Sequence, residues 1–165
     1  LMRVQLSLGS NQGARCDNLQ RAIQALEELD GVQVTAISRC YETAPLGKVD
    51  QPWFLNMAVE VETAVEPLEL LKAVKAIETR LGRRPDGRWE PRPIDIDIVL
   101  WGDRVMDSEE LTLPHRAFRG RAFVLVPLAE IAPDSVDPIS GMTVAELAGR
   151  PEAQGAVTPY AELGH

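Results

Sequence analysis

The sequence carries too little positive charge for a general nucleic-acid-binding protein. Among its 165 residues, 17 lysines and arginines stand against 25 aspartates and glutamates, which gives a formal net charge of −8. Proteins that bind nucleic acid through its phosphates usually show an excess of basic residues. We therefore expect no nucleic-acid partner, and any local cluster of arginines stands out against this acidic background.

Long apolar runs are absent too. No stretch approaches the ~20 apolar residues of a membrane span, and no secretory signal is visible at the start. The two cysteines, Cys16 and Cys40, do not have the spacing of metal ligands. We expect them to be thiols in the reducing cytoplasm, with a disulfide between them as the alternative. These features favour a cytoplasmic protein with no membrane partner.

Several catalytic signatures are also missing. The sequence contains no G-x-x-x-x-G-K-[ST] loop, and neither a Ser/His/Asp triad nor a zinc-ligand spacing can be picked out. Gly9-Ser10-Asn11 is only a weak phosphate-binding motif. Nothing in these patterns points to a P-loop NTPase, a triad hydrolase or a zinc enzyme.

Hydrophobic periodicity predicts a small mixed fold. Strands are expected at 3–8, 32–41, 54–63 and 94–100, and helices at about 19–29 and 66–81. This order is typical of a ferredoxin-like α+β fold, with a four-stranded antiparallel sheet and two helices on one face. Short helices at 122–131 and 143–148 would form a C-terminal helical extension, and the tail after 150 is expected to be loosely structured. We expect one domain over 1–165, and a monomer.

Two aspartates interrupt the last predicted strand. Alternate residues of a strand point to opposite sides, so Asp95 and Asp97 share one side, about 7 Å apart. Two such carboxylates can share a pair of hard cations. The same parity places Asn56 beside them, on the face that the two helices leave open. An exposed strand face with unrelated charges is the alternative. The apolar residues expected on the other side are Ile94, Ile96, Ile98 and Leu100.

Basic residues lie on both sides of this strand. Arginines suit phosphate oxygens, and arginines beside magnesium-binding carboxylates form the arrangement that phosphoryl transfer needs. A histidine within the second cluster suits ATP, although a solvated basic surface is the alternative. The first cluster is Arg83, Arg84, Arg88 and Arg92, and the second is His115, Arg116, Arg119 and Arg121.

Aromatic and amide side chains gather near the start of the third strand. An aromatic ring beside an amide can hold a flat heterocycle by stacking and by hydrogen bonds to its edge. Phe123 could supply a second ring for stacking. A core aromatic and a turn asparagine are the alternative. The residues near the strand start are Thr43, Leu46, Trp53, Phe54 and Asn56.

Six segments together carry a resemblance to a known family. They are LSLGSN (6–11), YETAPLG (41–47), DQPWFLN (50–56), RWEPRPIDIDIVLWGD (88–103), LTLPH (111–115) and RAFVLVPLAEIAPD (121–134). In order and spacing, the sequence resembles the 6-hydroxymethyl-7,8-dihydropterin pyrophosphokinases of folate biosynthesis. The resemblance implies a ferredoxin-like fold. It also implies transfer of the pyrophosphoryl group of MgATP to the pterin hydroxymethyl oxygen, with release of AMP.

The resemblance also implies roles for individual residues. Asp95 and Asp97 would bind two magnesium ions, and Arg83 and Arg92 would contact the phosphates and stabilise the transferring group. The pterin pocket would be lined by Thr43, Leu46, Phe54, Asn56 and Phe123. The nucleotide site would further include Glu78, Trp89, Ile98, Thr112, His115 and Arg121.

Some positions depart from the family pattern. Glu110 stands where the family often has a basic residue, Arg116 where it has an aromatic one, and Ala44 where proline is common. Two other classes of protein stay open from the residues alone. A ligand-binding module of the same fold would not need the Asp-x-Asp pair. A two-metal nuclease or nucleotidyl transferase would want more carboxylates and a basic groove.

Overall fold

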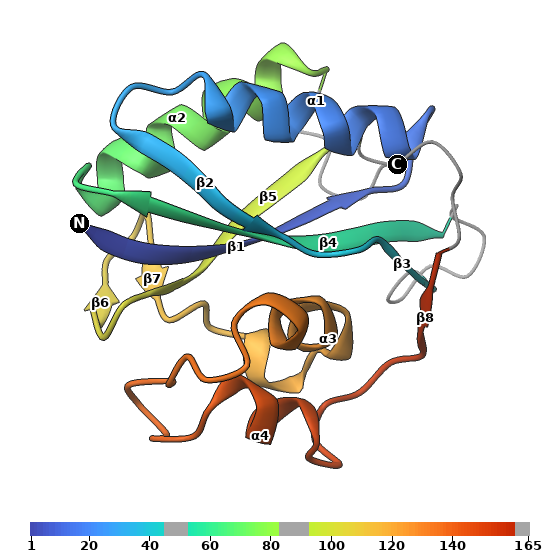
Figure 1. Ribbon diagram of the computed structural model, residues 1–165, viewed down its shortest axis with the longest axis vertical. Coiled ribbons are helices and arrows are strands. Elements are labelled where there is room, and N and C mark those ends of the chain that lie inside the picture. The colour runs from blue at the N-terminus through green and yellow to red at the C-terminus, as the bar shows by residue number, and fades with distance from the viewer. Residues whose placement is uncertain (45–52, 83–92, 161–165) are drawn as a thin grey trace.

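The computed structural model describes residues 1–44, 53–82 and 93–160. An antiparallel sheet forms the middle layer, with helices on both faces (Figure 1). The sheet strands among these residues are β1 (Met2–Ser10), β2 (Val32–Ile37), β3 (Tyr41–Thr43), β4 (Phe54–Thr63), β5 (Asp95–Trp101) and β8 (Val157–Pro159). The α-helices are α1 (Arg15–Glu27), α2 (Pro67–Arg80), α3 (Ala122–Ile131) and α4 (Val144–Ala148). This is a mixed α/β fold built on an antiparallel sheet, as the sequence predicted.

The strand predicted at 32–41 is in fact two strands. Central β1 pairs with β5 on one side and β4 on the other, and the far edge of β4 is shared by β2 and β3. Ser38 lies at the break between them. Its N–H donates to the Ala58 carbonyl at 2.9 Å, and its Oγ accepts from the Ala58 N–H at 2.8 Å. The side chain thus replaces a backbone partner, which a pattern of β-branched residues does not reveal.

Helices α1 and α2 cover one face of the sheet, here called the α1/α2 face (Figure 1). The helix predicted at about 66–81 is α2, and residues typical of helix ends bound it. Pro67 is the first residue of α2, and Gly82 follows its end with a φ of +106° that disfavours other residues. The core beneath the helices is continuous and apolar. It includes Val4, Leu6, Leu8, Leu26, Val59, Val61, Leu70, Val74, Ile77 and Ile96.

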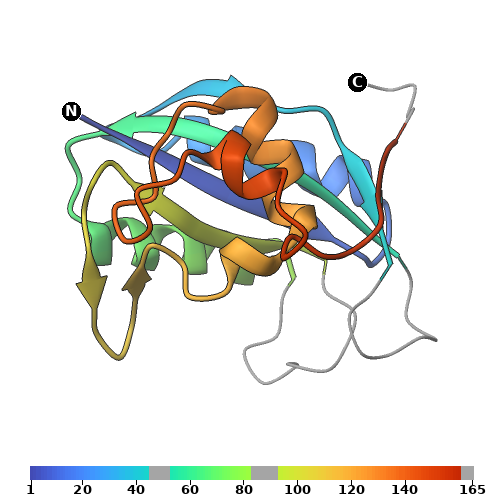
Figure 2. The same ribbon diagram turned by 90° about the horizontal axis from the view of Figure 1, so that it is seen from below.

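The opposite face also carries helices, so the expectation of a face without a helix layer is wrong. Helices α3 and α4 pack on it, as the view from below shows (Figure 2). They form a second core with Ala58 of β4 and Leu100 of β5. We call this the α3/α4 face. The capping box of Thr143 and Glu146 fixes the start of α4, at the predicted position.

A bulge in β5 corrects the predicted parity. Leu6 pairs with Ile98 and Gln5 with Leu100, so Val99 is an extra residue opposite the Gln5–Leu6 step. Ile96 and Ile98 belong to the α1/α2 core, but Leu100 belongs to the α3/α4 core. A regular strand would place Leu100 on the same face as Ile96 and Ile98, whereas here it lies on the opposite face.

The C-terminal segment is ordered, contrary to expectation. β8 pairs with β3, and the Tyr160 N–H donates to the Cys40 carbonyl at 3.0 Å. Earlier in the segment, the backbone of Gln154 pairs with the residues on either side of Arg121, just before α3. Its carbonyl accepts from the Ala122 N–H at 3.0 Å and its N–H donates to the Gly120 carbonyl at 3.2 Å. The segment therefore connects the start of α3 with the edge of the sheet.

Beyond β5, the chain forms a second, two-stranded sheet. β6 (Met106–Asp107) pairs with β7 (Thr112–Leu113) in a separate small sheet, and a single 3₁₀ turn (Phe118–Gly120) precedes α3. Within the described ranges, no helix is both long and apolar enough to cross a membrane.

Candidate active site

Polar residues meet at the end of the sheet where β1 finishes and where β4 and β5 begin. Gly9 pairs with Asn56 on one side and with Asp95 on the other, and Tyr41 pairs with Asn56. Directly paired residues of neighbouring strands point to the same side of a sheet. Asp95, Gly9, Asn56 and Tyr41 therefore form one row on the α3/α4 face, here called the polar row. Asp97 lies one step further along the same face, opposite Ser7.

A glycine is required in the middle of the polar row. A Cβ at Gly9 would lie 2.8 Å from Asn56 Oδ1 and 3.5 Å from the Phe54 ring. Any other residue would therefore displace the amide or fill the space above the strand. Gly9 leaves a flat floor between a carboxylate and an amide, which suits a planar ligand.

The predicted pterin residues on β3 and β4 come together beside this floor. Asn56 is 4% exposed, and its Nδ2 donates to Thr43 Oγ1 at 2.7 Å. Phe54 pairs in register with Thr43. The side-chain bond fixes the orientation of the amide, so its oxygen and remaining N–H keep a constant direction. Leu46 lies outside the described residues.

Burial and like charges act on the aspartate pair. The apolar surroundings of Asp97 raise its pKa to about 7, and the charges of Asp95 and Glu78 add to this effect. The Asp97 side chain is nevertheless 39% exposed, so its carboxylate can still be reached from outside. His115 Nε2 lies 4.0 Å from Asp97 Oδ2. Burial and the charge of Arg121 lower the pKa of His115, which favours its neutral form.

The carboxylates fit a magnesium site that is completed by a substrate. The described residues contain no cluster of three or more Asp, Glu, His or Cys side chains that could enclose a metal alone. Magnesium is usually held by one or two carboxylates, with waters and substrate phosphates at the other positions. Asp95 and Asp97 supply such a pair, and a divalent cation would offset their mutual repulsion, which adds to the effect of burial on the pKa of Asp97.

A cavity of about 210 Å³ opens next to Asp97, between α2, β5 and the segment around β7. Three predicted nucleotide residues line it, namely Ile98, Thr112 and His115. Sequence reasoning missed the α2 side of the cavity. Leu71 and Lys75 lie there, four residues apart on one side of the helix. Glu110 and Arg116, which depart from the family pattern, also line it.

Glu78 has a structural bond that the sequence did not reveal. Its side chain is 3% exposed, and Oε2 accepts from the Ile96 N–H at 2.7 Å. β5 has its strand partner β1 on the other side, so this carboxylate satisfies a donor on the outer edge of the sheet. Lys75 Nζ lies 3.5 Å from Glu78 Oε1 and partly balances the charge.

The remaining predicted residues lie at the start of α3 or outside the described ranges. Arg121 precedes the helix, and its guanidinium carbon lies 5.7 Å from the centre of the Phe123 ring. Phe54 and Phe123 thus belong to facing layers, one to the sheet and one to the helix above it. Arg83, Trp89 and Arg92 are outside the described residues.

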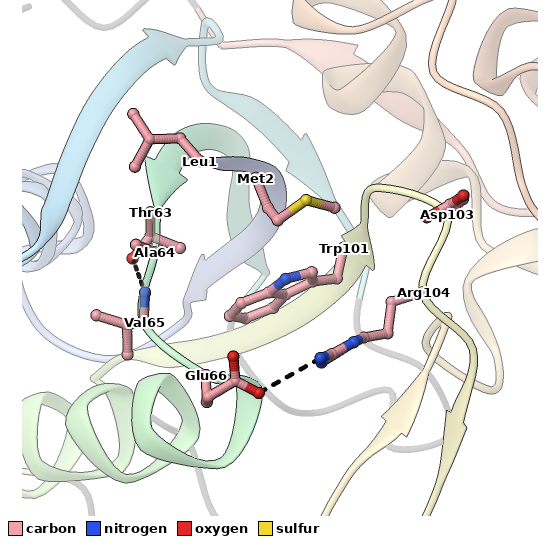
Figure 3. A pocket seen from close by; sticks show the side chains of 9 residues that line it. All are labelled: Leu1, Met2, Thr63, Ala64, Val65, Glu66, Trp101, Asp103 and Arg104. Atoms are coloured by element: carbon pink, nitrogen blue, oxygen red, sulfur yellow. Dashed lines mark hydrogen bonds and ion pairs between the residues drawn. The ribbon is translucent and has the colours of Figure 1, made fainter.

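A second cavity of about 200 Å³ lies at the other end of the sheet (Figure 3). Trp101 forms its floor, and Arg104 Nη2 lies 3.3 Å from Glu66 Oε1 at its rim. None of the residues predicted for the site lines this cavity. The chemistry suggested by the sequence therefore concentrates at the polar row.

Comparison with known proteins identifies the family. Residues 5–133 match the sequence model of the family described as 7,8-dihydro-6-hydroxymethylpterin-pyrophosphokinase (HPPK). The chain belongs to the HPPK family. Its relatives include an HPPK of Methylorubrum extorquens, 46% identical over 155 residues, which covers 94% of this chain and 97% of the relative. The HPPK of Pseudomonas aeruginosa is 43% identical over 134 residues, 81% of this chain and 83% of its own length.

Solved structures extend the HPPK likeness to the fold. The HPPK-DHPS protein of Plasmodium falciparum, solved with pteroate, superimposes with a TM-score of 0.71 at 17% identity. The match covers 89% of this chain but 44% of that longer one. At this identity the likeness shows the fold alone. Other relatives are longer too, because the match to the folic acid synthesis protein fol1 of Schizosaccharomyces pombe covers 20% of that protein.

Proposed function

We propose that the polar row and Asp97 form the centre of the HPPK active site in this chain. As a member of the family, the protein transfers the pyrophosphoryl group of ATP to 6-hydroxymethyl-7,8-dihydropterin in folate biosynthesis. The observation that carries our assignment is the register of β4, β1 and β5. It puts an amide, a glycine floor and two carboxylates side by side on one face.

The pterin is proposed to lie on the glycine floor. Asn56, held by Thr43, would bind the edge of the ring system, because an oriented amide can both donate and accept. Phe54 and Phe123 would stack on its two faces from the sheet and from α3. Leu46 completes this proposed pocket.

Asp95 and Asp97 are proposed to hold two magnesium ions together with ATP. When bound, magnesium draws the phosphate oxygens together and offsets the negative charge that develops during transfer. The chain's own contribution is to fix both carboxylates on one strand, on one side and next to the floor where the pterin would lie. Positioning of this kind accounts for much of the catalysis in phosphoryl transfer.

The proposed reaction is a displacement at the β-phosphorus of ATP. The pterin hydroxymethyl oxygen forms a bond to this phosphorus and loses its proton, while the bond to the α–β bridging oxygen breaks and AMP leaves. Arg83 and Arg92 are proposed to offset charge on the transferring oxygens. The nucleotide is proposed to occupy the cavity beside Asp97. Its further contacts would be Glu78, Trp89, Ile98, Thr112, His115 and Arg121.

The finer architecture is part of the same proposal. The strand order β5-β1-β4-β2, with α1 and α2 on one face, supports a ferredoxin-like core. Helices α3 and α4 then form the C-terminal extension. We propose that residues 1–165 make a single pyrophosphokinase domain that acts as a monomer.

The first experiment identifies the nucleotide product. The protein is incubated with MgATP, with and without 6-hydroxymethyl-7,8-dihydropterin. We expect AMP only with the pterin, in equal amount to pterin diphosphate. ADP would point to an ordinary kinase, and no product with retained pterin binding would point to a binding module. Either outcome would overturn the assignment.

A further inference from the structure

A partly buried hydrogen bond joins the sheet to α3 at the Tyr41 end of the polar row. Tyr41 is 4% exposed, and its hydroxyl donates to Glu130 Oε1 at 2.5 Å. Glu130 lies near the end of α3 and is 28% exposed. Tyr41 belongs to the polar row, but neither Tyr41 nor Glu130 is assigned above a contact with ATP or with the pterin.

Glu130 also binds the backbone at the break between β2 and β3. Its Oε2 accepts from the Arg39 N–H at 3.0 Å, and its Oε1 lies 3.4 Å from Arg39 Nε. Burial alone would raise the pKa of Glu130, but the hydrogen bonds from Tyr41 and Arg39 outweigh it and lower the pKa. The carboxylate is therefore charged at neutral pH, and hydrogen bonds to a charged acceptor are the stronger kind.

Both partners are rigidly connected to proposed pterin contacts. Tyr41 pairs with Asn56 and lies two residues before Thr43, so all three side chains are on the α3/α4 face. Glu130 lies seven residues after Phe123 in the same helix, which is two turns along one side of α3. The bond thus links β3, which carries Thr43 and pairs with the strand that carries Asn56, to the helix that carries the upper wall of the pocket.

We propose that Tyr41 and Glu130 are positioning residues that set the separation between the sheet and α3 for a planar ligand. This inference rests on the proposed function, because it takes Phe54, Asn56 and Phe123 as the walls of the pterin pocket. A flat ring stacked on both faces needs a gap of fixed width, and a helix free to shift would change that width. Apart from Arg121 at the start of α3, the proposed ATP contacts among the described residues lie around α2, β5 and β7, so ATP binding should depend little on this bond.

The test uses Tyr41→Phe and Glu130→Gln, which keep the packing of the ring and the shape of the carboxylate. Loss of one hydrogen bond to a charged group is expected to raise KM for the pterin about tenfold. KM for ATP should stay within about twofold of the wild type, because Arg121 is the one proposed ATP contact among the described residues that adjoins α3. Equal changes in both constants would overturn the proposal, since they would indicate general loosening of the fold.

Thr63→Val is the matched control. Thr63 is fully buried at the other end of β4, and its hydroxyl donates to the Gly31 carbonyl at 2.6 Å. The substitution removes one buried hydroxyl with little change of shape, as Tyr41→Phe does. We expect a comparable loss of thermal stability and unchanged KM values. A rise in the pterin KM of this variant would show that stability alone moves the constant, and would overturn the proposal.

A double-mutant cycle then tests whether the bond acts through Phe123. Pterin Kd is measured for Tyr41→Phe, for Phe123→Ala and for both together. If the bond positions Phe123, Tyr41→Phe should have little effect once the ring is removed. Additive effects would overturn the positioning role and leave the pterin pocket intact. An unchanged Kd in Phe123→Ala alone would instead show that the proposed pocket is wrong, and the positioning role would fail with it. AMP formation reports on the reaction separately.

Discussion

The two faces of the sheet are built from the same strands but differ in how much polar surface they carry. The α1/α2 face is apolar along its whole length, from Val4 to Leu8 on β1. The α3/α4 face is divided. One part packs against α3 and α4 through Ala58 and Leu100, and the other part carries the polar row. The first face can be optimised for packing alone, whereas the second must hold charges that packing does not favour.

The division shows in the electrostatics of the two parts. In the α3/α4 layer, the buried carboxylate of Asp137 accepts two hydrogen bonds from Arg119, one from Ser140 and one from the Ile139 N–H. In the polar part, Asp97 has Asp95 and Glu78 as neighbours, and its pKa rises instead. A paired carboxylate stabilises the fold, whereas a carboxylate among like charges is poised for a ligand.

The largest expected effect comes from Asp97→Ala. Loss of half of the carboxylate pair should lower turnover at least about 10³-fold, because the cations that offset transition-state charge are no longer held. Thermal stability should not fall, since the substitution removes a repelled charge. Turnover is measured by AMP release and stability by calorimetry. Asp134→Ala, at an exposed position after α3, is the control and should match the wild type. Near-normal turnover of Asp97→Ala would refute the metal assignment.

The opposite result is expected for Asp137→Asn. Burial would raise the pKa of Asp137, but the hydrogen bonds from Arg119 and Ser140 outweigh it and lower the pKa to about 2. The substitution leaves the Arg119 guanidinium without its charged partner, so the free energy of unfolding should fall by about 3 kcal/mol. Urea denaturation measures this loss. The folded variant should still bind ATP. A stability equal to that of the wild type would show that the Arg119–Asp137 ion pair does not stabilise the α3/α4 layer.

The smallest expected effect is a pH dependence of the free energy of unfolding of the metal-free protein. The pKa of Asp97 is about 7 in the folded state against 3.8 as the reference value. The folded state therefore holds this proton more tightly, and the free energy of unfolding should decrease as pH rises from about 4 to about 7. Because the side chain is 39% exposed, solvent limits the decrease to about 1 kcal/mol. Urea denaturation at pH 5 and pH 8 measures it, and Asp97→Asn should reduce the difference. If the stability difference between pH 5 and pH 8 were the same in the wild type and in Asp97→Asn, the pH dependence would not come from Asp97.

Local patterns were sufficient for most of the elements. The strand predicted at 54–63 is β4, and the helix predicted at 122–131 is α3. The ends of two other helices also carry signals that act within a few residues, namely the proline at the start of α2 and the threonine before α4. Site residues on one strand or on paired strands were likewise accessible, because alternation puts Asp95 and Asp97 on one side.

The errors all involve partners that are distant in the sequence. The bulge at Val99 and the break at Ser38 depend on register with neighbouring strands, and β8 depends on the exposed edge of β3. The role of Glu78 at the edge of β5 follows only from the packing of α2. One missed feature did have a signal. Helix α3 is apolar on nearly all sides, which indicates burial from more than one direction and hence a covered sheet face.

The extra residue in β5 shifts by one position which residues of the strand face each side of the sheet. Before Val99, the β5 side chains on the α3/α4 face are Asp95 and Asp97. From there on, that core receives Val99 and Leu100 in succession, and Trp101 packs in the other core. The bulged residue is also held in place, because its carbonyl accepts from the His115 N–H at 2.9 Å. One strand can therefore present charge at one end of the α3/α4 face and hydrocarbon at the other end of the same face.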